Sequence, residues 1–256
     1  MDEQHASTVR VEEGRKRVRA YVGGELVADT VRPLLVWEAP YYPMYYFPAV
    51  DVRKELLDDT GDTHHSPRRG DARLLDVRGG HGERRTKAAS WYDESPVPAL
   101  AGTVRLDWDA MDWFEEDEPV AVHPRNPYTR VDILNSSRHV RVEHEGVVLA
   151  DSHQPRMLFE TGLIPRLYLP LTDARLDLLR PSETVSHCPY KGEARHWSLV
   201  LDDGAVVEDL AWTYWSPLPE CVKIRGLVAF YDEKLDVAVD GTRQERPERP
   251  FVDLRR

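Results

Sequence analysis

Hydrophobic and polar residues alternate along much of the chain, with the period of two that a β-strand has when one of its faces is buried. The alternation is clearest at residues 17–22 (RVRAYV) and 139–144 (HVRVEH). Residues 195–201 and 205–215 show the same pattern on either side of a glycine-containing turn, which is typical of a β-hairpin. This pattern predicts a mainly β protein built from antiparallel strands.

One short helix is expected in each half of the chain. Residues 51–59 (DVRKELLDD) and 173–181 (DARLDLLRP) place apolar residues at helical spacing. Each segment begins with an aspartate, Asp51 or Asp173, whose side chain can accept a hydrogen bond from the first turn of a helix. The prediction is therefore a mainly β fold with one short helix per half.

The two halves of the chain are copies of each other. With an offset of 122 positions, residues 17–57 align with residues 139–179 without a gap, and 14 of the 41 aligned residues are identical. The segments 63–73 (THHSPRRGDAR) and 185–195 (VSHCPYKGEAR) continue the alignment. Their shared proline and glycine indicate a turn that the fold builds twice. A tandem duplication predicts two small antiparallel β domains of the same kind.

The duplication divides the chain into four segments. The first copy takes residues 17–113 and the second takes residues 138–241, each with roughly one hundred residues, which is enough for a small core of its own. Residues 114–137 are predicted to be a linker, although the apolar residues near its end are expected to lie against one domain. Residues 242–256 form a charged tail that we expect to extend over the surface.

Composition and charge exclude several classes of function. The net charge of −11 disfavours binding to nucleic acid, which needs clustered lysine and arginine. No apolar run reaches the about 20 residues of a membrane helix, and the first residues lack the apolar core of a secretory signal. Two cysteines cannot build a disulfide framework. We therefore expect a cytoplasmic protein without a membrane or nucleic-acid partner.

The ten histidines do not predict a metal site. The close pairs are His64 with His65 and His187 with His196, and neither pair has the ligand number or spacing of a closed zinc site. The segments SPRRG and PYKG lack the spacing of a phosphate-binding loop. The sequence thus predicts no metal and no cofactor, and it leaves the oligomeric state open.

Three segments of the second copy carry a resemblance to a known family. They are SHCPYKGEARHW at 186–197, AWTYWSPLPE at 211–220 and IRGLVAFYDEKLDVAVDG at 224–241. These segments resemble the DUF427 family, a family of unknown function. The first copy is more divergent, with Ser66 in the place of Cys188 and Ser90 in the place of Trp212. The resemblance implies a small, mostly antiparallel β domain, tent-like or sandwich-like, and it implies no catalytic residues.

Aromatic residues gather in the second copy and suggest a binding pocket. Trp212 and Tyr214 lie two positions apart, so a strand places their rings on one face. Such rings line small-molecule pockets or cages for cations, and they also fill β cores. We predict a ligand-binding module in which Lys191 and Glu220 fix an anionic or polar group. The predicted ligand-binding residues are Tyr190, Lys191, Trp212, Tyr214 and Glu220, with Glu160 and Arg175 behind them.

Two other hypotheses belong to different classes. In the first, the protein is an enzyme with Cys188 as nucleophile and His187 or His196 as base, and Lys191 lowers the pKa of the thiol. Adjacent side chains of an extended segment point to opposite faces, which disfavours a direct pair of His187 and Cys188. In the second, the protein is a structural or partner-binding module, and the duplication creates one composite surface.

Overall fold

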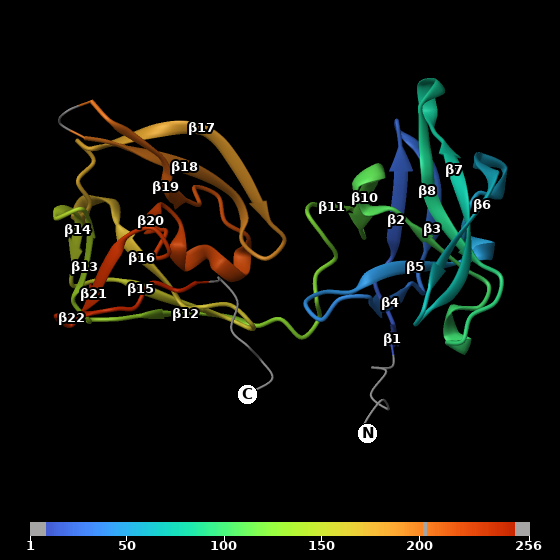
Figure 1. The fold of residues 1–256 in the computed structure, drawn as a ribbon, viewed down its shortest axis with the longest axis horizontal. Helices are drawn as coiled ribbons and strands as arrows, with labels where there is room; N and C mark the ends of the chain where they lie inside the picture. Colours follow the sequence, from blue (N-terminus) through green and yellow to red (C-terminus); the bar gives the residue numbers. More distant parts are fainter. Residues whose placement is uncertain (1–8, 202–203, 249–256) are drawn as a thin grey trace. The chain divides into compact units, whose positions relative to one another are not determined.

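The chain folds into two compact units that divide between residues 126 and 127. The structure, a computed structural model, describes residues 9–201 and 204–248. Each unit contains one seven-stranded and one four-stranded antiparallel sheet (Figure 1). The predicted mainly β class and the tandem duplication are confirmed.

In the first unit, the seven-stranded sheet has the order β1-β4-β5-β9-β8-β7-β6 and the four-stranded sheet has the order β11-β10-β2-β3. The strands of the larger sheet are β1 (Arg10–Glu13), β4 (Leu34–Trp37), β5 (Met44–Pro48), β6 (Leu57–Ser66), β7 (Gly70–Arg78), β8 (Arg84–Tyr92) and β9 (Thr103–Leu106). Those of the smaller sheet are β2 (Val18–Val22), β3 (Glu25–Thr30), β10 (Asp112–Glu115) and β11 (Glu118–Val120).

The second unit repeats this topology, with the orders β12-β15-β16-β20-β19-β18-β17 and β14-β13-β21-β22. The larger sheet consists of β12 (Val131–Asn135), β15 (Arg156–Glu160), β16 (Arg166–Pro170), β17 (Leu179–Cys188), β18 (Gly192–Val200), β19 (Val206–Thr213) and β20 (Leu227–Phe230). The smaller sheet consists of β13 (Val140–His144), β14 (Val147–Ser152), β21 (Asp236–Val239) and β22 (Thr242–Arg243).

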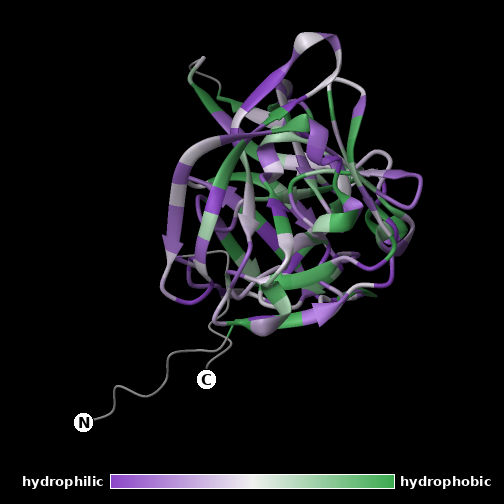
Figure 2. Ribbon diagram, turned by 90° about the vertical axis from the view of Figure 1, so that its right-hand side faces the viewer, coloured by the Kyte–Doolittle hydropathy of each residue, from purple (hydrophilic) through white to green (hydrophobic). Residues whose placement is uncertain are grey.

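The central strands of the larger sheet of the second unit are buried on both faces. Leu169 of β16 and Ala211 of β19 belong to a core that also contains residues of β13, β14 and β21 from the smaller sheet. Their chain neighbours Tyr168 and Trp212 point to the opposite face and form a second cluster with residues of the 3₁₀ helix η7 (Pro219–Ile224). Because residues alternate between the two faces of a strand, the period-two pattern of the sequence appears as alternating hydropathy along several strands (Figure 2).

The short helix expected in each copy is present only as 3₁₀ turns. These are η1 (Ala49–Asp51) and η2 (Lys54–Leu56) in the first unit and η6 (Leu171–Asp173) in the second. Asp51 and Asp173 do not cap an α-helix; their carboxylates accept hydrogen bonds from Thr30 (2.8 Å) and Ser152 (2.6 Å) of the smaller sheets. The following residues enter the long strands β6 and β17, so pairing within the sheet overrides the local helical pattern.

The predicted linker and tail are partly strands of the two units. Within residues 114–137, β11 completes the smaller sheet of the first unit and β12 forms an edge of the larger sheet of the second. In the tail, β22 pairs with β21, and Arg243 and Arg246 form ion pairs with Asp236. Residues 202–203, in the predicted hairpin turn, and the end of the tail lie outside the described residues. Among the residues that the structure describes, no helix is long and apolar enough to cross a membrane.

Candidate functional site

The recurring proline–glycine segment is the turn of a hairpin in both units. Ser66 pairs with Gly70 at the end of β6–β7, and Cys188 pairs with Gly192 at the end of β17–β18. Gly70 and Gly192 have φ of +85° and +96°, a region that L side chains rarely adopt. The prediction of a turn that the fold builds twice is therefore confirmed. In the second unit, this turn carries Lys191 into the interior.

Lys191 forms a buried ion pair with Glu160, the last residue of β15. Only 11% of the Lys191 side chain and 5% of the Glu160 side chain are exposed. Burial lowers the pKa of Lys191, but Cys188 and the Glu160 carboxylate raise it, and the net shift is upward. Lys191 is therefore a cation, and its charge is balanced by the Glu160 carboxylate.

The ion pair borders a cavity of about 180 Å³ on the face of the larger sheet that points away from the smaller sheet. Aromatic rings make up much of its wall: Tyr168, Trp212, Tyr214 and Tyr231. Trp212 Nε1 donates a hydrogen bond of 3.2 Å to the Tyr168 hydroxyl, and the two rings are perpendicular. Burial raises the pKa of both Tyr168 and Tyr214, so their hydroxyl groups are protonated at neutral pH.

Arg166 contributes a second cation to the cavity wall, and this cation is also paired. Its guanidinium donates two hydrogen bonds to Glu233, at 2.9 and 2.5 Å, and lies 5.6 Å from the centre of the Trp212 ring. Asp232 lies 3.9 Å from Arg166, and burial raises the pKa of its carboxyl to about 6. Arg166 is thus held by carboxylates on one side and by an aromatic face on the other.

A hydroxyl–imidazole pair completes the polar part of the cavity wall. Ser186 Oγ lies 2.8 Å from His196 Nε2. Burial lowers the pKa of His196, so its imidazole is neutral at neutral pH. Its other nitrogen, Nδ1, is buried and has no hydrogen-bond partner among the described residues. Together the two groups can donate or accept hydrogen bonds toward a bound molecule, or exchange a proton with it.

The corresponding carboxylate of the first unit, Glu38, is saturated by its own chain. Its Oε1 accepts hydrogen bonds from the Tyr46 hydroxyl and from Arg105 Nε, both at 2.8 Å, and its Oε2 lies 2.5 Å from Arg69. Arg69 corresponds to Lys191 by the offset of the duplication. These contacts lower the pKa of Glu38 although burial raises it.

Arg105 has no counterpart in the second unit. Arg105 pairs with Ser90 across β8 and β9, whereas the equivalent pair across β19 and β20 is Trp212 with Ala229. At these positions the first unit has the small residue on β8 and the large one on β9. The second unit has the large residue on β19 and the small one on β20. Within the described part of the chain, Lys191 is the sole hydrogen-bond partner of the Glu160 carboxylate, and Oε1 of that carboxylate accepts no bond.

Comparison with known proteins agrees with the duplicated fold. The sequence profile of a family described as "Domain of unknown function (DUF427)" matches residues 10–117 and 132–241. The chain belongs to the DUF427 family. No functionally curated protein matches it at a significant level. The cavity therefore has to be interpreted from its own geometry, and it lies in the second DUF427 repeat.

The second DUF427 repeat brings together some of the residues singled out in the sequence. Glu160, Lys191, Trp212 and Tyr214 line the cavity. The other three lie elsewhere. Tyr190 lies in the hairpin turn, where its carbonyl accepts a hydrogen bond from Cys221. Glu220 is exposed on η7, and Arg175 pairs with Asp177 at the surface.

The residues of the nucleophile hypothesis do not form a dyad in this repeat. His187 is exposed and its Nε2 lies 3.6 Å from Glu193, its partner on β18. His196 bonds to Ser186 instead. The partly buried Cys188 thiol makes no hydrogen bond with either imidazole. Strand geometry explains the result, because consecutive side chains of β17 point to opposite faces.

The predicted ligand-binding set leaves out five polar or aromatic residues of the cavity wall, Arg166, Tyr168, Ser186, His196 and Tyr231, although His196 is a candidate base in the nucleophile hypothesis. Tyr168 was recoverable, because Tyr46 stands at the equivalent position and both follow the shared glutamate by eight residues. Arg166, Ser186 and His196 come from three different strands and Tyr231 directly follows β20, so only the pairing of the strands places them around one space.

Proposed function

We propose that the second DUF427 repeat is a small-molecule-binding module whose ligand occupies the cavity beside Glu160. The observation that carries the proposal is the contrast between the two glutamates. Glu38 is saturated by Tyr46, Arg69 and Arg105, whereas Glu160 has one partner and an acceptor oxygen left over beside a cavity. Because this oxygen accepts no hydrogen bond from the described residues and faces the cavity, a donor group on a ligand can bond to it.

The ligand class follows from the group that the first repeat supplies from its own chain. There, the Arg105 guanidinium bonds to the glutamate oxygen that stays open in the second repeat. We infer that the ligand carries a guanidinium, amidinium or ammonium group, which donates to Glu160 and lies against the rings of Trp212 and Tyr231. Lys191 and Arg166 are both already paired, which disfavours the anionic ligand expected from the sequence.

The size of the cavity limits the ligand further. A volume of about 180 Å³ is below the roughly 300–1,000 Å³ of pockets for drug-sized molecules. Position 229 is equivalent to Arg105 of the first unit. Because residues 212 and 229 face each other across β19 and β20, the Trp212 ring takes up part of the space that an arginine side chain at position 229 would need. The cavity therefore suits a small cation, or the cationic end of a longer molecule.

Thermal shift and native mass spectrometry test this proposal. Methylguanidinium at low millimolar concentration should raise the melting temperature, and its neutral analogue N-methylurea should have a smaller effect. The double variant Trp212→Ser with Ala229→Arg copies the pair Ser90–Arg105 of the first repeat, so the fold has a precedent for it. It should abolish the response to methylguanidinium and release any co-purified ligand.

An exposed variant outside the cavity, Glu220→Gln, serves as the control and should respond like the wild type. Equal stabilisation by N-methylurea would reject the cationic ligand class. A double variant that still retains a co-purified ligand would reject the cavity as the binding site.

A further inference from the structure

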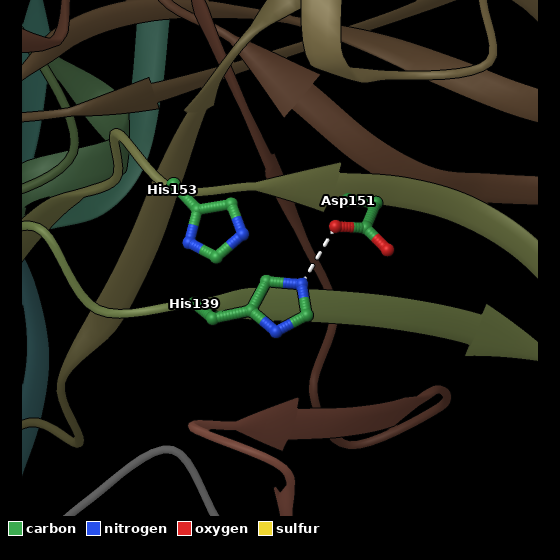
Figure 3. A group of neighbouring side chains, drawn as sticks. All are labelled: His139, Asp151 and His153. Carbon is green, nitrogen blue, oxygen red and sulfur yellow. Dashed lines mark hydrogen bonds and ion pairs between the residues drawn. The ribbon is translucent and has the colours of Figure 1, made fainter.

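A second group of chemically active side chains lies on the smaller sheet of the second unit, away from the cavity. His139 directly precedes β13, Asp151 lies in β14 and His153 directly follows Ser152, the last residue of β14. Val140 pairs with Ser152 and Arg141 with Asp151, so this register brings the two histidines opposite each other. Figure 3 shows both rings and the carboxylate pointing toward one another from the two strands.

The three side chains offer ligand atoms at close range. One atom from each, two imidazole nitrogens and a carboxylate oxygen, lie within 4.8 Å of one another. His139 Nε2 is 2.6 Å from Asp151 Oδ1, and the two imidazole rings stack with centroids 4.3 Å apart.

In the first unit, two of the three equivalent residues form an ion pair. The equivalent residues are Arg17, Asp29 and Val31. Arg17 donates two hydrogen bonds to Asp29, at 2.8 and 2.5 Å, and Val31 is 69% exposed. One cation beside the aspartate is thus sufficient for an ion pair across the two strands. His153 is not needed for that pair, yet it adds a third ligand atom.

We propose that His139, Asp151 and His153 form a binding site for a divalent transition-metal ion, with Zn²⁺ as the reference cation. Two imidazoles and one carboxylate are a ligand set that such ions accept, and a fourth position remains open to water. The ion replaces the hydrogen bond between His139 Nε2 and Asp151 Oδ1, and any proton held there is released to solvent. Arg141 lies 3.3 Å from Asp151 Oδ2 and orients the carboxylate, which leaves Oδ1 for the metal.

Small side-chain rotations suffice to reach ligand distances. Zinc requires nitrogen and oxygen ligands at about 2.0–2.2 Å. His139 and Asp151 are partly exposed, at 34% and 42% of their side chains, so neither is locked by packing. The backbone that carries the ligands is fixed by the ladder between β13 and β14, which gives the site its register.

Isothermal titration of the untagged full-length chain with Zn²⁺ tests the site. The wild type should bind one ion per chain. His139→Arg and His153→Val each restore the residue of the first unit, and each removes one of three ligands, so each should weaken binding by more than about tenfold. Circular dichroism checks that both variants keep the fold.

The double variant His64→Ala with His65→Ala, in the first unit, should bind Zn²⁺ like the wild type. Binding of Co²⁺ adds an independent readout, because ligation by nitrogen and oxygen gives no thiolate absorption band whereas ligation by Cys188 gives one. The proposal is overturned if the wild type binds no Zn²⁺ at millimolar concentration, if His139→Arg and His153→Val both leave the affinity unchanged, or if a thiolate band appears.

Discussion

One glutamate in each copy shows how a single neighbour changes the role of a side chain. Glu38 and Glu160 occupy equivalent positions and both bond to the basic residue of the hairpin turn. Arg105 saturates Glu38, and the substitution of Ala229 for that arginine leaves Glu160 with an open acceptor. The same carboxylate is a structural link in one unit and a candidate ligand-binding group in the other.

The buried ion pair of the second unit makes a prediction at this scale. Glu160→Gln leaves the Lys191 cation without its partner, and we expect a loss near the lower end of the about 3–5 kcal/mol seen when a buried pair is broken. Glu160→Gln combined with Lys191→Met removes both charges and should recover most of that loss. Urea unfolding of the wild type, the two single variants and the double variant measures the coupling. Additive losses in the double variant would contradict a direct pair.

At the scale of elements, the hairpin β17–β18 delivers both Lys191 and the Ser186–His196 pair to the cavity. Its turn depends on a glycine with positive φ, and the equivalent turn of the first unit depends on another. The surroundings of the two glycines differ. A Cβ on Gly70 would lie 2.6 Å from Pro96 Cδ, whereas a Cβ on Gly192 would meet only ordinary contacts at 3.5 Å.

Alanine substitutions at the two glycines should therefore differ in cost. Gly192→Ala pays only the strain of positive φ, about 1–2 kcal/mol. Gly70→Ala adds the overlap with Pro96, so we expect a loss of about 3 kcal/mol in the first unit. Thermal unfolding monitored by circular dichroism compares the two variants with the wild type. A loss for Gly192→Ala equal to or larger than that for Gly70→Ala would show that side-chain overlap does not govern these turns.

The strands, the duplication and the repeated turn could be predicted from the sequence because each leaves a local signal. Alternation marks the strands, and the offset of 122 marks the copies. The helix is predicted from apolar spacing and an N-terminal aspartate, and pairing of β6 and β17 within their sheets reduces it to 3₁₀ turns. Ser186 and His196 could not be paired in advance, because their contact depends on the register in which Ser186 faces Ala194.

The metal-ligand group shows the same limit. His139 and Asp151 are twelve positions apart, and without the register of β13 and β14 the sequence gives no reason to join them to His153. Comparison of the two copies does point to this group, because the second copy has histidines where the first has Arg17 and Val31, and the aspartate of the group is present in both. Differences between the copies that cluster around a shared residue therefore indicate a candidate metal site better than the number of histidines does.

At the scale of the whole molecule, the two units share a fold and differ at both candidate sites. Each unit has its own pair of sheets and its own buried cores. In the first unit, arginines occupy both places where the second has a candidate site: Arg105 beside Glu38 and Arg17 beside Asp29. The first unit therefore serves as an internal reference for the fold without either site.

Separate expression of residues 1–126 and 127–256 tests this division. Each unit should fold alone, because a domain of this size buries enough surface to be stable without a partner. The second unit alone should keep the thermal response to methylguanidinium and the binding of Zn²⁺, since every residue of both candidate sites belongs to it. The first unit should show neither. Cooperative melting followed by circular dichroism establishes folding, and loss of either response in a folded second unit would mean that the first unit contributes to that site.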